Sequence, residues 1–442
     1  MHAPSPTVVD PATAPSPAES GSGTAASRRR SRYPWLVFAI TFGLLLSDYM
    51  SRQVLSAVFP SLKEQWALSD SQLATLTSVV ALMVGLLTLP LSVIADRWGR
   101  VRSLTLMAVL WSLATVLCAV ATSFEQMLGA RFLLGVGEAA YGSVGIALVL
   151  SIFTPRVHAT LSGAFMAGGS FGSVLGVSLG GVIAVHLGWR WTFAAMAVFG
   201  LLLVAAFRAT VTEDRLAAHA ASDVAPSRTA ATYRAPLRSL FTNPPVLAAY
   251  VGGGLQMFSA AVLLAWTPSF FNRYYGMPMD RAAIAAAAIV LLVATGMIVC
   301  GMITDRIGRD DITRKWIAAI AFCVVSLVCL PTGFALETGA AQLILIAIGA
   351  FFAAGSSGPI AAMVANLSHP TVRASAMGTL TVANNLLGLA LGPFIVGVLA
   401  DHIGLGRALT ITPLIYLVAI AALLLGKRLH SLGVARLARL PR

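Results

Sequence analysis

Four charged residues that interrupt apolar stretches are the part of this sequence best suited to chemistry: Asp48, Arg52, Arg131 and Glu138. An ionisable side chain at the centre of a bilayer costs at least about 2.5–3.5 kcal/mol to insert. Four such groups in one half of a chain therefore need a functional reason. A buried carboxyl group can carry a proton, and a guanidinium group suits carboxylate and phosphate geometry.

The spacing of these residues predicts that they meet on facing helices. Asp48 and Arg52 stand four residues apart, and Arg131 and Glu138 share a face with Gly135, where a neighbouring helix can approach closely. We interpret Glu138 and Asp48 as proton-coupling residues, because burial favours a protonated acid whereas a nearby arginine favours an ionised one. The alternative is a static pair of buried salt bridges, but such pairs are poor stabilisers compared with apolar contacts.

The charge of the substrate follows less directly from these four residues. Two acids balance two bases, so protonation of one acid leaves a net positive site that can hold an anion. This arithmetic fits proton–anion symport, and it also fits a lipid with a phosphate head. Further residues that could contact a solute are Tyr141, Gln256, Trp266 and Asn384. Each of them could instead serve helix packing or interhelical hydrogen bonds, and Trp266 could belong to an interfacial aromatic belt.

The composition shows which elements must position these side chains. The chain has 442 residues, of which 57% are hydrophobic and 11% charged, against about 25% charged in soluble domains. The apolar runs are continuous and long enough to cross a membrane, which indicates helices and not a barrel. We expect about twelve spans, over residues 34–59, 73–95, 103–120, 126–152, 158–185, 191–207, 246–271, 282–303, 316–334, 342–367, 375–400 and 408–425.

The distribution of basic residues predicts the orientation of these helices. The net charge is +13, yet only Lys63, Arg190, Arg273, Arg281 and Arg407 fall between spans on one side, while most of the other Lys and Arg residues fall on the opposite side. This is the positive-inside pattern, which places both termini in the cytoplasm and argues against nucleic-acid binding. The sequence has no GxxxxGK loop and no metal-type cysteine spacing, so we expect neither ATP hydrolysis nor a metal or other cofactor.

The chain divides into two similar halves. We expect a disordered cytoplasmic tail over 1–33, a six-helix bundle over 34–208, a cytoplasmic linker over 209–243, a second six-helix bundle over 244–427 and a basic tail over 428–442. The loop 96–100 (DRWGR) returns at 305–309 (DRIGR), and the segment 181–188 has a weaker echo at 397–404. Two echoes in register with the helix count indicate a duplicated six-helix unit, which places a substrate site between the repeats.

These doubled D-R-x-G-R loops resemble the signature loop of the major facilitator superfamily. The resemblance implies two bundles that rock around a central site, and a conformational latch formed by Asp96, Arg97, Gly99, Arg100, Asp305, Arg306, Gly308 and Arg309. The stretches 48–53, 131–141 and 384–388 are similar to those of spinster-like transporters and organic-anion permeases. One departure from that pattern is Ser51, because those families usually carry Asp immediately before the arginine.

Together these patterns predict a proton-coupled symporter of the bacterial inner membrane that works as a monomer by alternating access. Its partners would be protons, a lipid bilayer and a small organic anion or another small amphipathic solute. The alternatives are a spinster-like lysolipid exporter or flippase and, from another class, a non-transporting receptor or scaffold. An enzyme is not expected, because no nucleophile–base pair or metal cluster stands out.

Overall fold

The computed structural model describes residues 32–154, 157–219, 240–309, 311–369 and 372–438, which form helices joined by short connections. Twelve of its helical segments are long and apolar enough to cross a membrane. This confirms the expected all-helical membrane architecture. Most of the tail 1–33, much of the linker 209–243 and the last residues of the tail 428–442 lie outside the described residues.

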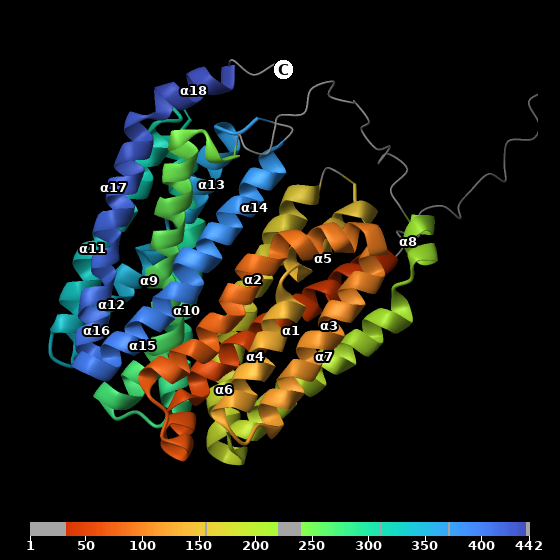
Figure 1. Ribbon diagram of the computed structural model, residues 1–442, viewed down its shortest axis with the longest axis vertical. Helices are drawn as coiled ribbons and strands as arrows, with labels where there is room; N and C mark the ends of the chain where they lie inside the picture. The colour runs from red at the N-terminus through yellow and green to blue at the C-terminus, as the bar shows by residue number, and fades with distance from the viewer. Residues whose placement is uncertain (1–31, 155–156, 220–239, 310, 370–371, 439–442) are drawn as a thin grey trace, which may run out of the picture.

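The first half of the chain supplies six of these spans (Figure 1). Its helices are α1 Tyr33–Trp66, α2 Asp70–Trp98, α3 Arg100–Val120, α4 Phe124–Glu138, α5 Tyr141–Ile152, α6 His158–Leu187 and α7 Trp189–Thr210, followed by the short α8 Glu213–His219. The fourth span, which runs from Phe124 to Ile152, consists of α4 and α5 with a break between them. Several helices extend a few residues beyond the expected ranges, because their last turns are polar.

The second half repeats this arrangement with more interruptions. Its elements are α9 Pro244–Tyr275, α10 Met279–Ile307, α11 Arg314–Ala335, α12 Ala340–Ala353, α13 Ser357–Asn366, α14 Arg373–Ala383, the π-helix η4 Asn384–Ala390, α15 Leu391–Ile403, α16 Leu405–Ile411, the 3₁₀ turn η5 Thr412–Leu414, α17 Ile415–Arg428 and α18 His430–Ala438. The tenth span breaks between α12 and α13, as the fourth breaks between α4 and α5. π-helical turns are rare and occur frequently at functional sites.

Corresponding helices of the two halves end in the same way. The residues that directly follow α1 and α9 are Ala67 (φ 50°) and Gly276 (φ 59°), and those that directly follow α6 and α15 are Gly188 (φ 90°) and Gly404 (φ 83°). A positive φ lets the chain turn sharply at a helix end, and glycine adopts it without strain. The weaker sequence echo, 181–188 and 397–404, therefore marks a repeated helix end and its preceding turns.

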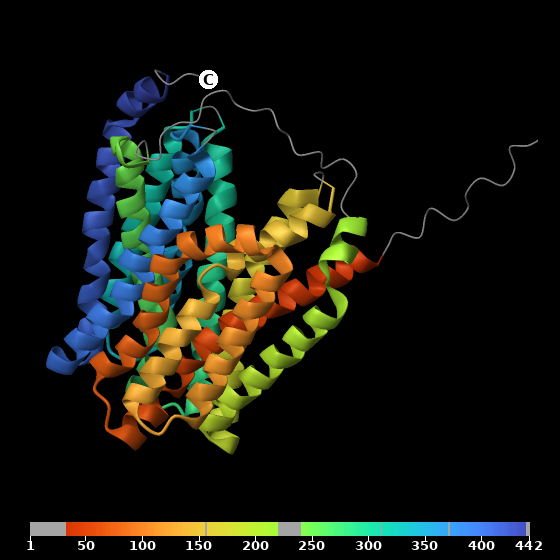
Figure 2. The ribbon, with the colours of Figure 1, turned by 45° about the vertical axis from the view of Figure 1, so that its right-hand side comes forward.

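The two halves form two helical bundles that meet side by side (Figures 1 and 2). Between the bundles, α6 packs against α10 and α2 packs against α15 and η4, while α1 also contacts α9. We call the end at Ala67, Gly188, Gly276 and Gly404 the sealed end, because the bundles converge there. We call the opposite end, which carries α8 and α18, the basic end.

The buried hydrophobic clusters differ between the sealed end and the basic end. One core runs through both bundles and includes Phe59 and Leu73 of the first bundle with Trp266 and Ala283 of the second. A separate core belongs to the first bundle alone and includes Val37, near the basic end. The bundles therefore share buried apolar contacts toward the sealed end, while the first bundle has its own core toward the basic end.

Candidate functional site

The two buried acids lie next to each other between α1 and α4. Asp48 and Glu138 are each 6% exposed, and their carboxyl groups lie close enough to interact electrostatically. A carboxylate only accepts hydrogen bonds, so two adjacent carboxyl groups can bond to each other only when one of them is protonated. Asp48 Oδ1 and Glu138 Oε1 have no hydrogen-bond partner. A proton shared by the pair would give these buried oxygens a partner.

The break after α4 places Glu138 at this point. Thr88 of α2 donates its hydroxyl to the carbonyl of Ala139 at 2.7 Å, which satisfies a backbone acceptor that the broken helix leaves free. α4 also lies very close to its neighbours: a Cβ on Gly135 would come 2.9 Å from the Val80 carbonyl oxygen, and one on Gly137 would come 2.7 Å from the Trp111 nitrogen. The break and the close helix contacts together fix the glutamate beside α1.

Arg131 is fully buried, but it does not bind a carboxylate. Its Nε donates to the Leu76 carbonyl at 3.2 Å, Nη1 to the Ser51 carbonyl at 3.1 Å and Nη2 to the Arg52 carbonyl at 3.0 Å. These bonds tie α4 to α2 and α1. The guanidinium still acts electrostatically on Glu138. The expected alternative of two static salt bridges is therefore not what the structure forms.

Arg52 is the cation of the group that remains available. Its side chain is half-buried, and within the described residues it makes no hydrogen bond or ion pair. Its charge nevertheless acts on both carboxyl groups. A guanidinium with five unused donors can bind a carboxylate through two parallel hydrogen bonds. The structure thus brings together two adjacent buried acids and a cation that makes no ion pair within the described residues.

Two other predicted solute contacts serve packing in this conformation. Tyr141 is fully buried and donates its hydroxyl to the Thr41 carbonyl at 2.8 Å. Its ring lies edge-on to the Trp111 ring, with the ring centroids 4.8 Å apart. Trp266 is fully buried, donates Nε1 to the Pro393 carbonyl at 3.2 Å and contacts the Phe59 ring of the other bundle at 5.5 Å. Its place in a core shared by both bundles differs from the interfacial belt considered as an alternative.

In the second bundle, the Gln256 side chain reaches a helix break and Asn384 begins a π-helix. Gln256 is buried and donates Nε2 to the carbonyl of Ala353, the last residue of α12, at 3.0 Å, so it satisfies the break of the tenth span. Asn384 begins the π-helix η4. Gln256 Oε1 and Asn384 Oδ1 both lack a partner. Both amide oxygens are buried and unpaired in this conformation.

The residues of the expected latch that have a described side-chain partner bind within their own bundles. Arg100 donates Nη1 to the Ala147 carbonyl at 3.2 Å, and Asp305 pairs with Lys315 at 2.9 Å. Gly99 ends α2 with φ 95°. The side chain of Asp96 lies outside the described part of the chain. Among the remaining latch residues, Arg97, Arg306 and Arg309 are exposed at the basic end, and Gly308 ends α10.

Sequence reasoning missed a set of charges at the sealed end. Asp70 pairs there with Lys63 and with Arg273 of the other bundle. An acid in the first turn of one helix and an arginine in the last turn of another were the available signals. Nothing in the sequence indicated that these two helix ends meet.

Known proteins resemble this chain over most of its length. The profile described as Major Facilitator Superfamily matches residues 41–393. The chain is 25% identical over 388 residues to the probable L-galactonate transporter of Escherichia coli K12, with 85% of each chain covered. It is 24% identical over 403 residues to protein spinster homolog 1 of Xenopus tropicalis, covering 85% of this chain and 75% of that one.

A solved structure shares the fold. The crystal structure of a bacterial homologue of the human lysosomal transporter spinster, in an inward-facing and occupied conformation, superposes with a TM-score of 0.78 at 19% identity. The match covers 90% of this chain and 97% of that chain. At this identity the likeness shows the fold alone.

Proposed function

Because the chain belongs to the major facilitator superfamily, we propose that it is a proton-coupled symporter of a small organic anion. Family membership confirms the resemblance seen in the D-R-x-G-R loops and makes the chain a multi-pass membrane transporter and not an enzyme. The proposal adds the coupling ion, the substrate class, the bacterial inner membrane and function as a monomer. The positive-inside rule then assigns the basic end to the cytoplasm.

The observation that carries this proposal is the half-buried Arg52 beside the carboxyl pair of Asp48 and Glu138. With one shared proton, the pair bears one negative charge against the two guanidinium groups, so the group has a net positive charge. An anion bound at Arg52 cancels the charge that favours ionised carboxyl groups. Anion binding therefore favours proton binding, and by linkage proton binding favours the anion to the same degree. This reciprocal preference is what a symporter requires.

The substrate class rests on the same cation and on a relative. The E. coli relative is named for L-galactonate, which is a hydroxylated carboxylate. A carboxylate matches the fork of Arg52, and hydroxyl groups match free amide oxygens such as those of Gln256 and Asn384. We therefore favour a hydroxylated organic acid as the transported anion.

A lysolipid is the second candidate, because the Xenopus relative is a spinster homologue. A lysolipid phosphate could also bind Arg52, so the cation does not distinguish the two classes. The apolar tail of a lysolipid does distinguish the two substrate classes, because the tail would have to pass from the bundle interface into the bilayer. A receptor or scaffold, the remaining alternative, would move neither solute nor protons.

Flux measurements in proteoliposomes test the proposal. Purified protein is reconstituted with a pH dye inside, and hydroxylated carboxylates and lysolipids are added in turn. We expect acidification driven by a carboxylate gradient, and its loss in Glu138→Gln. Glu125→Gln, an exposed acid in the first turn of α4, is the matched control and should retain it. Lysolipid movement without carboxylate flux would replace the substrate class, and carboxylate flux without acidification would overturn proton coupling.

A further inference from the structure

The sealed end contains two symmetry-related contacts between the bundles. A Cβ on Gly181 of α6 would lie 2.2 Å from Ala283 Cβ, and one on Gly397 of α15 would lie 2.6 Å from Ala74 Cβ. Gly181 and Gly397 begin the two echoing segments, and Ala74 and Ala283 have the same spacing as Asp96 and Asp305. Any larger residue at either glycine would force the helices apart. The repeated segment therefore builds two equivalent close contacts that hold the bundles together.

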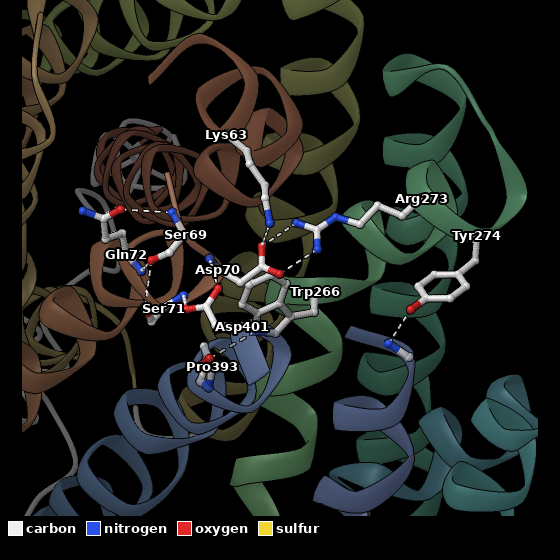
Figure 3. A network of polar contacts seen from close by, with 11 residues as sticks. Lys63, Ser69, Asp70, Ser71, Gln72, Trp266, Arg273, Tyr274, Pro393 and Asp401 are labelled. Carbon is white, nitrogen blue, oxygen red and sulfur yellow. Dashed lines mark hydrogen bonds and ion pairs between the residues drawn. The ribbon is translucent and has the colours of Figure 1, made fainter. Parts of the chain in front are cut away.

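Charges reinforce the contact between α15 and α2 (Figure 3). The Asp70 side chain, 4% exposed, accepts from Arg273 Nη2 at 2.6 Å and Nη1 at 2.8 Å, and from Lys63 Nζ at 2.6 Å. Arg273 belongs to the second bundle, whereas Asp70 and Lys63 belong to the first. A bidentate arginine–carboxylate pair is among the strongest charged hydrogen-bond arrangements. This pair joins α9 to α2 across the bundle interface.

Asp401 adds a second charged bond across the same interface. Its carboxylate accepts from the backbone nitrogen of Asp70 at 2.7 Å and of Ser71 at 2.9 Å. These nitrogens belong to the first turn of α2, where backbone donors lack helical partners and the helix dipole favours a negative charge. An acid of the second bundle thus caps a helix of the first, and the cap is lost if the bundles part.

The symmetry-related contact lacks such charges. Met279 stands where Asp70 stands in the other repeat, and its sulfur accepts only a long bond from the Ser61 hydroxyl at 3.6 Å. The neighbouring acid Asp280 makes no hydrogen bond or ion pair within the described residues. The sealed end therefore has two matched glycine contacts, and only the contact of Gly397 with Ala74 is accompanied by ion pairs among the described residues.

We propose that Asp70, held by Arg273 and flanked by Asp401, is an electrostatic latch that keeps the sealed end shut. The inference rests on the proposed function, because alternating access requires this end to open. Opening must remove a buried carboxylate from its arginine and uncap α2, and separating a buried charge from its partner is unfavourable. Asp70 thus biases the transporter toward the conformation open at the basic end.

Inter-spin distances measured by double electron–electron resonance test the latch. Cysteines replace the exposed Glu64 of α1 and the exposed Arg407 of α16, which lie in different bundles at the sealed end. Cys118, Cys300, Cys323 and Cys329 are first replaced by alanine. The full-length protein is labelled in lipid nanodiscs without substrate. We expect one dominant short distance, and a ratio of long to short distances raised about fivefold or more by Asp70→Asn.

Asp280→Asn is the matched control, since it removes an acid from the first turn of the corresponding helix, and it should leave the distances unchanged. Arg273→Gln should reproduce the effect of Asp70→Asn. Asp401→Asn, which alters an exposed side chain, provides a milder variant if the others do not yield folded protein. Unchanged distances in every folded latch variant, or an equal shift in Asp280→Asn, would overturn the latch. The readout needs no proton or anion flux, so its result is independent of the failure of proton coupling.

Discussion

Arg131 Nη1 donates to the backbone carbonyl of Ser51 at 3.1 Å, so the most deeply buried cation of the site is held by backbone and not by an acid. Together with the bonds to the Leu76 and Arg52 carbonyls, this makes Arg131 a clamp among three helices. The positive charge beside Glu138 is thereby fixed in place. Arg52, in contrast, is free to respond to a ligand.

Arg131→Lys should therefore lower stability more than it changes anion affinity. A lysine ammonium cannot reach three carbonyls with the geometry of a planar guanidinium, and each lost charged hydrogen bond is worth about 1.5–3 kcal/mol. Thermal unfolding in detergent measures the effect. Arg102→Lys, at an exposed position of α3, is the control and should leave Tm unchanged. An unaltered Tm in Arg131→Lys would show that the clamp does not support the fold.

Arg52→Gln should weaken anion binding with little loss of stability. The substitution removes the available charge, and a charged hydrogen bond worth about 1.5–3 kcal/mol corresponds to about a 10–150-fold rise in Kd. Isothermal titration calorimetry with the transported carboxylate gives this value directly. If Arg52→Gln binds the carboxylate as tightly as the unaltered protein does, the anion is held elsewhere.

The effects of Asp48→Asn and Glu138→Gln on proton coupling should not be additive. In the proposed mechanism the two adjacent carboxyl groups share one proton, so either substitution alone removes the shared site. The double variant should therefore couple anion flux to protons no worse than the worse single variant. Proton and anion fluxes in proteoliposomes supply the comparison. Multiplicative losses would mean that each acid carries its own proton.

His430 should make the fold sensitive to acid. Its Nδ1 accepts from Trp316 Nε1 at 3.3 Å, and burial holds the pKa of His430 below its usual 6.5, with the Asp311 charge partly opposing the shift. A lowered folded-state pKa means that the unfolded chain takes up the proton first. Stability therefore falls as pH drops below 6.5, and the fall levels off below the lowered pKa of His430.

Thermal unfolding at about pH 7.5 and about pH 5.5 tests this dependence. His430→Asn should show a smaller loss of Tm on acidification than the unaltered protein. His402→Asn, at the exposed sealed-end terminus of α15, is the control and should keep the full loss. An equal loss of Tm in His430→Asn and the unaltered protein would assign the acid sensitivity to other groups.

The spans could be predicted because each depends on its own apolar run. The predicted range 34–59 misses Tyr33 and the polar last turns of α1, which continues to Trp66. The breaks at Ala139 and Ala354 could not be predicted in this way. They depend on bonds from other helices, such as that of Thr88 to Ala139 and that of Gln256 to Ala353. A local sequence pattern does not show which donors a neighbouring helix will present.

The sequence predicted which residues belong to the site better than it predicted the hydrogen bonds between them. Spacing along single helices suggested that the four charged residues meet on facing helices, but it did not show that the Arg131 guanidinium reaches carbonyls of α1 and α2. The pairing of Asp70 with Arg273 joins residues far apart in sequence and in different bundles. Only the approach of the two bundles at the sealed end creates it.

The most direct test of the central claim is proton uptake upon anion binding. Purified protein in weakly buffered detergent, with a pH-indicator dye, is titrated with the transported carboxylate. We predict uptake of up to about one proton per bound anion, greatest where the free protein's carboxyl pair is largely deprotonated, and no uptake in Glu138→Gln. Carboxylate binding without proton uptake at any pH, or uptake that persists in Glu138→Gln, would contradict the acid pair as the coupling site.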